Sequence, residues 1–206
     1  MVWRASIKMK LQLWFPTAIY IEDLPNALEL NKYLMKHIKQ WHKKDKGLQK
    51  TNRGGWHSTV DMQNKKEYKP LVDELLCMAT GIGREEGYTR PLALGNMWTN
   101  INYPGCFNKD HVHPNAHWSG VYYIKTPKKC GRLHIEDPRT SANMMLPTQL
   151  PVGKIPERLW KSVNFEPVEG KLIMFPAYLN HCVQVNESKL KGEKGWRISV
   201  SFNFVQ

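Results

Sequence analysis

Hydrophobic and polar residues alternate with a period of two through much of the second half of the chain. The clearest case is the run from residue 197 to residue 205, whose polar positions are Arg197, Ser199, Ser201 and Asn203. Apolar residues fill the positions between them. Because successive side chains of a strand point to opposite faces, the apolar set should pack on a core. The polar set should face either water or a polar cavity.

Short runs of this kind, separated by glycine and proline, predict six strands: Leu94–Tyr103, Ser119–Lys125, Gly131–Asp137, Lys171–Phe175, His181–Val185 and Arg197–Val205. Many short strands joined by turns are typical of an antiparallel sandwich or barrel. In the first of these strands, Trp98, Asn100 and Asn102 share one face. Two strands with polar faces favour a cavity that receives a polar ligand. The segment Thr140–Pro167 is expected to be a long, functional loop.

The first 90 residues show a helical pattern instead. Apolar residues recur every three or four positions from Ala27 to Trp41, with lysines on the other face, and Asp23 and Pro25 mark the start. A second helix is predicted from Tyr68 to Met78, ended by the glycines that follow. We therefore expect an α+β protein with a single domain over residues 1–206, made of a helical layer (1–90) and a β-barrel (91–206).

Composition agrees with a globular protein. Hydrophobic residues make up 41% of the 206 residues, and no apolar run approaches the length of a membrane span. The basic N-terminus has no continuous apolar segment of the kind found in a signal peptide. The four cysteines are far apart, without a C-x-x-C pair. These features predict a soluble, cytoplasmic protein with reduced thiols and no membrane partner.

The formal net charge is +12, from 30 basic and 18 acidic residues. Such an excess makes nucleic acid a possible partner. Much of the excess lies between Asn31 and Gly55, where lysines follow the predicted helix and the loop after it. A solvated helix face explains this run as well as a binding surface does.

Three histidines lie in the short segment HVHPNAH, at positions 111, 113 and 117. On an extended backbone His111 and His113 point the same way, as two ligands of one metal ion would. His181, just before a predicted strand, is the best third ligand. Neutral imidazole suits iron, zinc and copper.

Two other kinds of protein remain open at this point. Structural zinc could be bound by Cys106, His111, His113 and Cys130, although their spacing is not the usual paired one. A non-catalytic, cupin-like barrel could instead bind a metal or a small anion in its cavity.

The order of the motifs changes this balance. The chain contains WHS at 56–58, H-x-HPN followed by SGVYY at 111–123, DPR at 137–139, GKLIMFP and a histidine at 170–181, and RISVSFN at 197–203. In this order the motifs resemble the Fe(II)- and 2-oxoglutarate-dependent oxygenases, and most closely a branch of that superfamily found in marine bacteria and their phages. The resemblance runs from about Phe15 to Phe204.

The resemblance implies a double-stranded β-helix (jelly-roll, cupin-like) core flanked by N-terminal helices. It implies a dioxygenase that uses Fe(II), 2-oxoglutarate and dioxygen, and that couples decarboxylation of 2-oxoglutarate to oxidation, usually hydroxylation, of an unknown substrate. The substrate classes of the superfamily include small molecules, protein side chains and nucleobases. If the gene is carried by a phage, the enzyme would act in the host cytoplasm.

The resemblance also assigns roles to residues. His111, His113 and His181 would bind iron. Arg197 would bind the distal carboxylate of 2-oxoglutarate, with Ser199 and either Tyr123 or Tyr122 as further donors. Asn100 and Asn102 would line the cofactor cavity. Asp137 and Arg139 are expected to form an ion pair, or to contact the substrate together with Trp98.

One position departs from the superfamily pattern, which has a carboxylate two residues after the first histidine. Here that position is His113. If His111 is the first ligand, the site is a three-histidine centre. Alternatively, His113 is the first ligand and His111 a neighbour, so that another group, water or a halide fills the vacant position, which would also permit halogenation. The third alternative is that activity has been lost. His57 is expected to be a packing residue. A homodimer could form by pairing of an exposed final strand.

Overall fold

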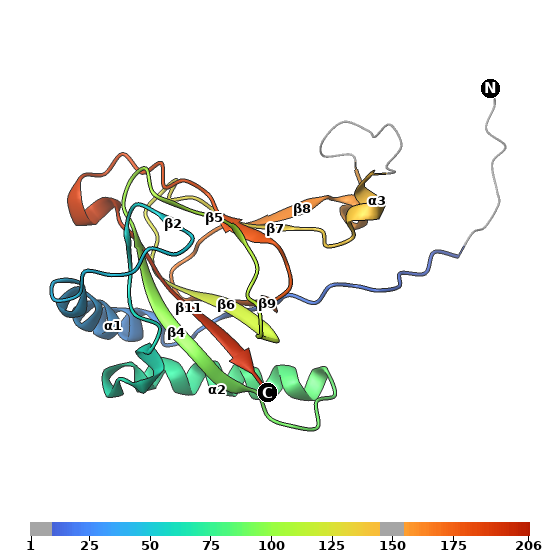
Figure 1. Ribbon diagram of the computed structural model, residues 1–206, viewed down its shortest axis with the longest axis horizontal. Coiled ribbons are helices and arrows are strands. Elements are labelled where there is room, and N and C mark those ends of the chain that lie inside the picture. Colours follow the sequence, from blue (N-terminus) through green and yellow to red (C-terminus); the bar gives the residue numbers. More distant parts are fainter. Residues whose placement is uncertain (1–9, 145–154) are drawn as a thin grey trace.

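The computed structural model describes residues 10–144 and 155–206, which form two antiparallel sheets. The six-stranded sheet has the order β1-β9-β6-β11-β4-β3, and the five-stranded sheet the order β2-β5-β10-β7-β8 (Figure 1). The strands of the first sheet are β1 (Tyr20–Asp23), β9 (Lys171–Pro176), β6 (Trp118–Lys125), β11 (Arg197–Val205), β4 (Ala93–Asn102) and β3 (Trp56–His57). Those of the second are β2 (Asn52–Arg53), β5 (Phe107–His111), β10 (His181–Val183), β7 (Leu133–Glu136) and β8 (Ser162–Phe165).

Two long helices, α1 (Ala27–His42) and α2 (Lys69–Glu85), cover one face of the six-stranded sheet (Figure 1). The main core lies between them. Its fully buried members include Leu34 and Ile38 of α1, Leu75 of α2, and Val200 and Phe202 of β11. The apolar alternation of β11 therefore packs on the helices, as predicted. The described residues also contain one short helix, α3 (Thr140–Met144), and four 3-10 turns: Met62–Asn64, Lys66–Tyr68, Glu157–Leu159 and Gly192–Gly195.

All six predicted strands are present, and the two sheets with their helical layer confirm the α+β jelly-roll class. Five strands were not predicted: β1, β2, β3, β5 and β8. The first four are short or carry little alternation. The fifth corrects the expectation of a loop over Thr140–Pro167, because β8 lies inside that segment and pairs with β7. Residues 145–154 of the segment lie outside the described residues.

The end of α2 and the start of α1 differ from the prediction. The helix α2 continues through Gly81 and Gly83 to Glu85, and the left-handed residue that follows it is Gly87, with φ of 69°. Asp23 belongs to β1, and the residue that precedes α1 is Asn26. The helix continues past Gly81 and Gly83 because packing of its buried face stabilises it by more than the two glycines cost in helix propensity.

The final strand is not exposed. β11 is hydrogen-bonded to β4 on one side and to β6 on the other, over nearly its full length. The expected route to a homodimer through this strand is therefore wrong, because its backbone groups already have partners. Among the described residues, no helix is long and apolar enough to cross a membrane.

The contact between β6 and β11 predicts the effect of a small substitution. A Cβ atom on Gly120 would overlap the ring of Phe202 and lie 2.7 Å from the carbonyl oxygen of Ile173. Gly120→Ala should therefore lower the free energy of unfolding by about 1–3 kcal/mol, measured by urea denaturation. The matched control is Gly81→Ala, because Gly81 has open space around it in α2. That variant should gain about 0.5–1 kcal/mol. Equal stability of the two variants would contradict the packing described here.

Candidate active site

A cavity of about 280 Å³ lies between the two sheets. The polar faces of β4 and β11 form one wall, and the histidines of the second sheet lie opposite. The lining residues include Trp98, Asn100, Asn102, Arg197, Ser199 and Ser201. The prediction that the two polar strand faces border one cavity is confirmed.

The strand register arranges these side chains in rows. Arg197 is opposite Asn102, and Ser199 lies between Asn100 on β4 and Tyr123 on β6. One row further along, Ser201 is opposite Trp98. Directly opposed side chains of an antiparallel pair lie about 5 Å apart, so each row presents adjacent polar groups to the cavity.

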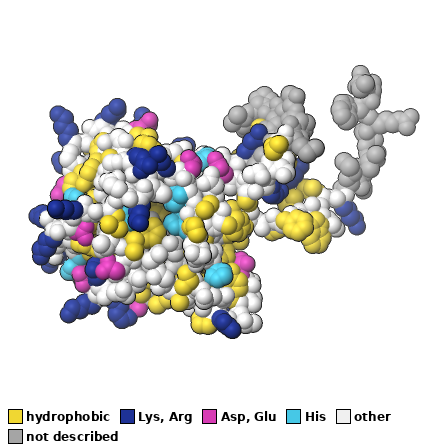
Figure 2. Space-filling model, viewed as in Figure 1, with side chains coloured by type: hydrophobic (Ala, Val, Ile, Leu, Met, Phe, Trp, Pro, Cys, Tyr) yellow, Lys and Arg dark blue, Asp and Glu magenta, His cyan; other side chains and the backbone are white. Residues whose placement is uncertain are grey.

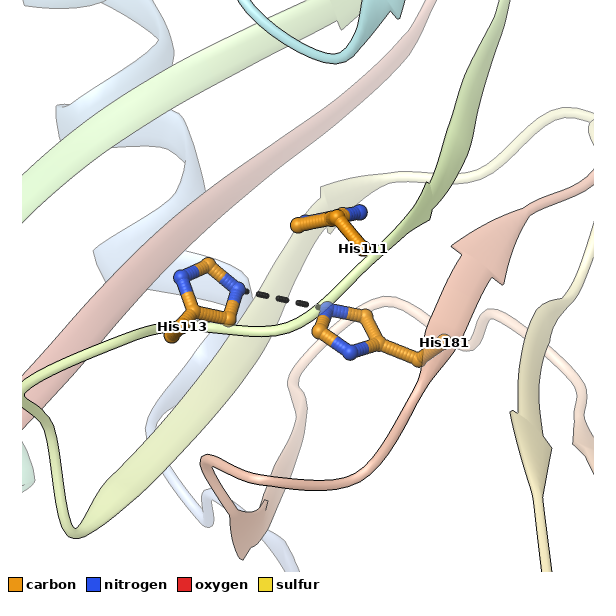
Figure 3. Close-up of side chains that lie close together, drawn as sticks. All are labelled: His111, His113 and His181. Atoms are coloured by element: carbon orange, nitrogen blue, oxygen red, sulfur yellow. Dashed lines mark hydrogen bonds between the residues drawn. The ribbon is translucent and has the colours of Figure 1, made fainter.

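The three predicted metal ligands come together at the second wall. His111 ends β5, His113 follows it, and His181 begins β10, where it pairs in register with His111. One ring nitrogen from each histidine lies within 4.8 Å of the other two. The Nε2 atoms of His113 and His181 are 3.3 Å apart (Figure 3). The turn before His181 thus places its side chain beside a pair separated from it by some 70 residues of sequence.

Two of these imidazoles are oriented by the backbone. His111 donates a hydrogen bond from Nδ1 to the carbonyl oxygen of Lys109 at 2.7 Å, and His181 donates from Nδ1 to Leu179 at 2.9 Å. Each Nε2 atom therefore keeps its lone pair. This pattern is common in metal-binding histidines, whose second nitrogen is fixed by a carbonyl group.

The same surroundings keep the imidazoles neutral. Burial, and the nearby imidazoles of His181 and His111, lower the pKa of His113 to about 3. Burial and His111 lower the pKa of His181 to about 4, and burial lowers the pKa of His111. Since only a neutral imidazole can bind a metal, the three groups are in the required state at neutral pH.

Three neutral nitrogen ligands on one side of an open cavity fit iron(II), which needs protein ligands on one face and free positions for other molecules. Within the described part of the chain, the group suited to a metal ion contains these three histidines and neither cysteine. Cys106 packs against Gly54, and Cys130 lies beside Arg197. The alternative of a zinc site with two cysteines is therefore wrong.

Arg197 is the most unusual residue of the cavity wall. Its side chain is 1% exposed, and its Nη1 atom donates to the carbonyl oxygens of Cys130, Gly131 and Gln184. Its Nη2 atom is buried and has no hydrogen-bond partner among the described residues. Burial lowers the pKa of the guanidinium, whose intrinsic value is so high that it stays charged. The cavity wall thus contains a fixed cation whose Nη2 atom has two free N–H groups.

Tyr123 and Ser199 line the cavity on the row next to Arg197. Burial raises the pKa of Tyr123, which therefore remains a donor. Tyr122, the alternative donor, does not line this cavity. Its side chain points to the opposite face of β6, and its hydroxyl donates to Asn31 of α1 at 2.8 Å.

The two asparagines of β4 border the cavity, as predicted. The Nδ2 atom of Asn102 donates to Asn108 at 3.1 Å, and that of Asn100 donates to Ser201 at 3.1 Å. The Oδ1 atom of Asn100 is buried without a partner among the described residues. Asn100 thus lines the cavity and has one acceptor atom without a partner among the described residues.

His57 was expected to be a packing residue, but it lies in the cavity wall. It is 4% exposed, and its ring stacks on Trp98 at 5.5 Å between centroids. Trp98 in turn contacts His113 at 5.9 Å. Burial lowers the pKa of His57, so its imidazole is neutral. No periodic signal could reveal this residue, because β3 has only two residues.

Asp137 and Arg139 lie elsewhere. The Nη2 atom of Arg139 is 2.7 Å from Asp137 Oδ2, so the expected ion pair is present. The two residues border a second hollow together with Trp14 and Trp160, and neither lines the histidine cavity. Their contact with a substrate stays a prediction, whereas Trp98 lines the histidine cavity.

Solved structures of similar fold support this interpretation of the architecture. A Pseudomonas putida prolyl-4-hydroxylase matches with a TM-score of 0.64 and 15% identity, over 92% of this chain and 93% of that one. The non-heme alpha ketoglutarate dependent epimerase SnoN matches with 0.64 and 11%, over 92% and 77%. The viral collagen prolyl hydroxylase of Paramecium Bursaria Chlorella virus-1, solved as a 2OG complex, matches with 0.55 and 15%, over 90% and 95%. At these identities the likeness concerns the double-stranded β-helix fold alone.

Sequence comparison gives the family. No sequence among the curated proteins matches this chain significantly. A family model described as "Putative 2OG-Fe(II) oxygenase" matches residues 96–203, which is more than half of the chain and contains the three histidines and Arg197. The chain therefore belongs to this family of 2-oxoglutarate- and Fe(II)-dependent oxygenases, enzymes whose cofactors are Fe(II) and 2-oxoglutarate.

Proposed function

We propose that the protein is a hydroxylase that holds Fe(II) on His111, His113 and His181 and binds 2-oxoglutarate through Arg197. The observation that carries this proposal is the shared cavity. Three neutral imidazoles and a buried guanidinium whose Nη2 atom has no partner among the described residues belong to the lining of one cavity of about 280 Å³. A metal site alone, or an anion site alone, would leave one of these groups unexplained.

The three-histidine ligand set is the form of the site that the geometry favours. His113 occupies the position where the superfamily pattern has a carboxylate, and its ring nitrogen is among the three that lie within 4.8 Å of one another. The position is thus filled by a neutral nitrogen ligand. A halogenase would need that position vacant for a halide, so hydroxylation is the better proposal.

The charge of this ligand set has a consequence for the cosubstrate. Three neutral ligands leave the full charge of a divalent ion in the cavity, and Arg197 adds one positive charge. None of the described residues that line the cavity is acidic. A dianion such as 2-oxoglutarate would neutralise two of these positive charges, with one carboxylate near the histidines and the other at Arg197.

The remaining residues of the wall would orient the cosubstrate and keep water away. Tyr123 and Ser199 would donate hydrogen bonds to the carboxylate at Arg197, and the apolar side chains of Val121, Leu133 and Phe175 would exclude solvent. The bound iron and 2-oxoglutarate would supply the oxidising chemistry, with dioxygen consumed and succinate and CO2 released.

We also propose that helices and barrel form a single domain over residues 1–206. The main core includes side chains from α1, α2, β4, β6, β9 and β11, so neither layer has a separate core of comparable size.

The metal ligands are tested by iron retention. The protein is loaded with Fe(II) under anaerobic conditions and passed through a gel-filtration column. His111→Ala and His181→Ala should then retain less than about one tenth of the iron that the unchanged protein retains, because each variant loses one of three ligands. His134→Ala is the matched control, since His134 bonds Asn164 outside the triad. His113→Asp should keep iron, because a carboxylate is also an iron ligand. Full retention by His113→Ala would instead favour a centre with two histidines.

The cosubstrate site is tested by titrating the anaerobic Fe(II)-loaded protein with 2-oxoglutarate and following the visible charge-transfer band of a chelated 2-oxo acid. Arg197→Met should weaken 2-oxoglutarate binding by about 100-fold, because two hydrogen bonds to a charged carboxylate are lost. Arg132→Met is the matched control, since Arg132 pairs with Glu166 at the surface. An unchanged affinity in Arg197→Met would refute the assignment of Arg197.

A further inference from the structure

Two buried side chains of the cavity wall lie side by side without a role in the proposed iron and cosubstrate sites. His57 on β3 is directly opposite Asn100 on β4. Both line the cavity, and they are 4% and 7% exposed. They continue the row formed by Ser199 and Tyr123, at the end of the row that lies away from β6.

The hydrogen bonds of this pair leave one acceptor atom free on each residue. The Nδ1 atom of His57 must carry the proton, because it donates to the carbonyl oxygen of Ser58 at 2.6 Å. Its Nε2 atom therefore presents a lone pair. The Nδ2 atom of Asn100 is engaged by Ser201, and its Oδ1 atom is buried without a partner among the described residues. An unsatisfied buried acceptor costs free energy unless a ligand pairs with it.

A neighbouring polar group at this end of the cavity, Asn203, is paired within the wall. Asn203 donates from Nδ2 to Asn96 at 2.8 Å and accepts from the hydroxyl of Ser119 at 2.7 Å. The ring of Trp98, held between His57 and His113, separates the acceptor pair from the histidine triad. The two free acceptors are therefore one aromatic ring away from the triad and are not used by the wall itself.

We propose that His57 and Asn100 form an acceptor pair that binds an uncharged hydrogen-bond donor of the prime substrate, either a carboxamide or a hydroxyl group. This inference rests on the proposed function, because it places the substrate beside the triad. A carboxylate or phosphate cannot donate to this pair, so neither the distal carboxylate of 2-oxoglutarate nor an anionic substrate group would bind there. A cationic group is disfavoured, because the charged residues that line the cavity are Lys50 and Arg197.

The test uses three small probes of the same shape: acetamide, acetate and acetamidinium. The full chain is loaded with zinc in place of iron, which avoids paramagnetic broadening, and with 2-oxoglutarate. Each probe is then titrated while the imidazole ¹⁵N resonances are recorded. We expect acetamide alone to move the His57 Nε2 resonance in a saturable manner. Asn100→Leu should weaken this binding about fivefold, the change expected for one lost hydrogen bond.

The matched control is Lys50→Met, which removes a charge from the cavity lining but leaves both acceptors in place. It should bind acetamide as the unchanged protein does. Stronger binding of acetate than of acetamide would overturn the inference, as would unchanged acetamide binding in Asn100→Leu. His57→Phe identifies the resonance, because its spectrum lacks that signal.

Failure of this inference can be told apart from failure of the proposed function. The anaerobic charge-transfer titration of the iron-loaded protein tests the cosubstrate site, and His57→Phe should leave the band in place. If the band forms but acetamide does not move the His57 resonance, the acceptor pair is refuted alone. If the band is absent while acetamide still binds at His57, the proposed function falls and the acceptor pair stands.

Discussion

The placement of β11 between β4 and β6 is the constraint on which the rest of the structure depends. Hydrogen bonds on both edges fix its register, and a shift by one residue would exchange its two faces. One face carries Ile198, Val200 and Phe202 into the core beneath α1 and α2. The other then necessarily carries Arg197, Ser199 and Ser201 into the cavity. The stability of the fold and the chemistry of the site are therefore two results of one alternation.

Burying polar groups costs free energy, and the hydrogen bonds of Arg197 offset only part of that cost. The guanidinium of Arg197 is fully buried, and three backbone carbonyls accept from one of its nitrogens. Its second terminal nitrogen remains without a partner among the described residues. No acidic residue lines the described cavity, so the positive charge has no internal counter-ion. Such an arrangement is stable only because the surrounding sheet holds it, and it is suited to an anionic ligand.

The sequence was sufficient for the parts of the fold that have a strong period. The alternation in β4 and β11 predicted the cavity wall, and the spacing of His111 and His113 predicted two converging ligands. It was insufficient where an element is short or where contacts are distant in sequence. The two-residue strand β3 gave no signal, so the position of His57 in the cavity was missed. Tyr122 and Tyr123 are adjacent in sequence, and only the register with β11 decides which of them faces the cavity.

The charges on the surface and the groups inside the cavity act at different stages: the first on the approach of a ligand, the second on its recognition. Lysines gather around the end of the molecule that carries α1 (Figure 2), although Lys32 and Lys39 are paired with Glu29 and Glu193. A surface of net positive charge attracts anions over a distance of about 10 Å at moderate salt. Inside the cavity, however, the free groups differ from place to place: a cation at Arg197, and neutral acceptors at His57 and Asn100. The basic surface therefore explains how a dianionic cosubstrate is drawn in, but it does not determine the second substrate, whose selection depends on uncharged hydrogen-bonding groups.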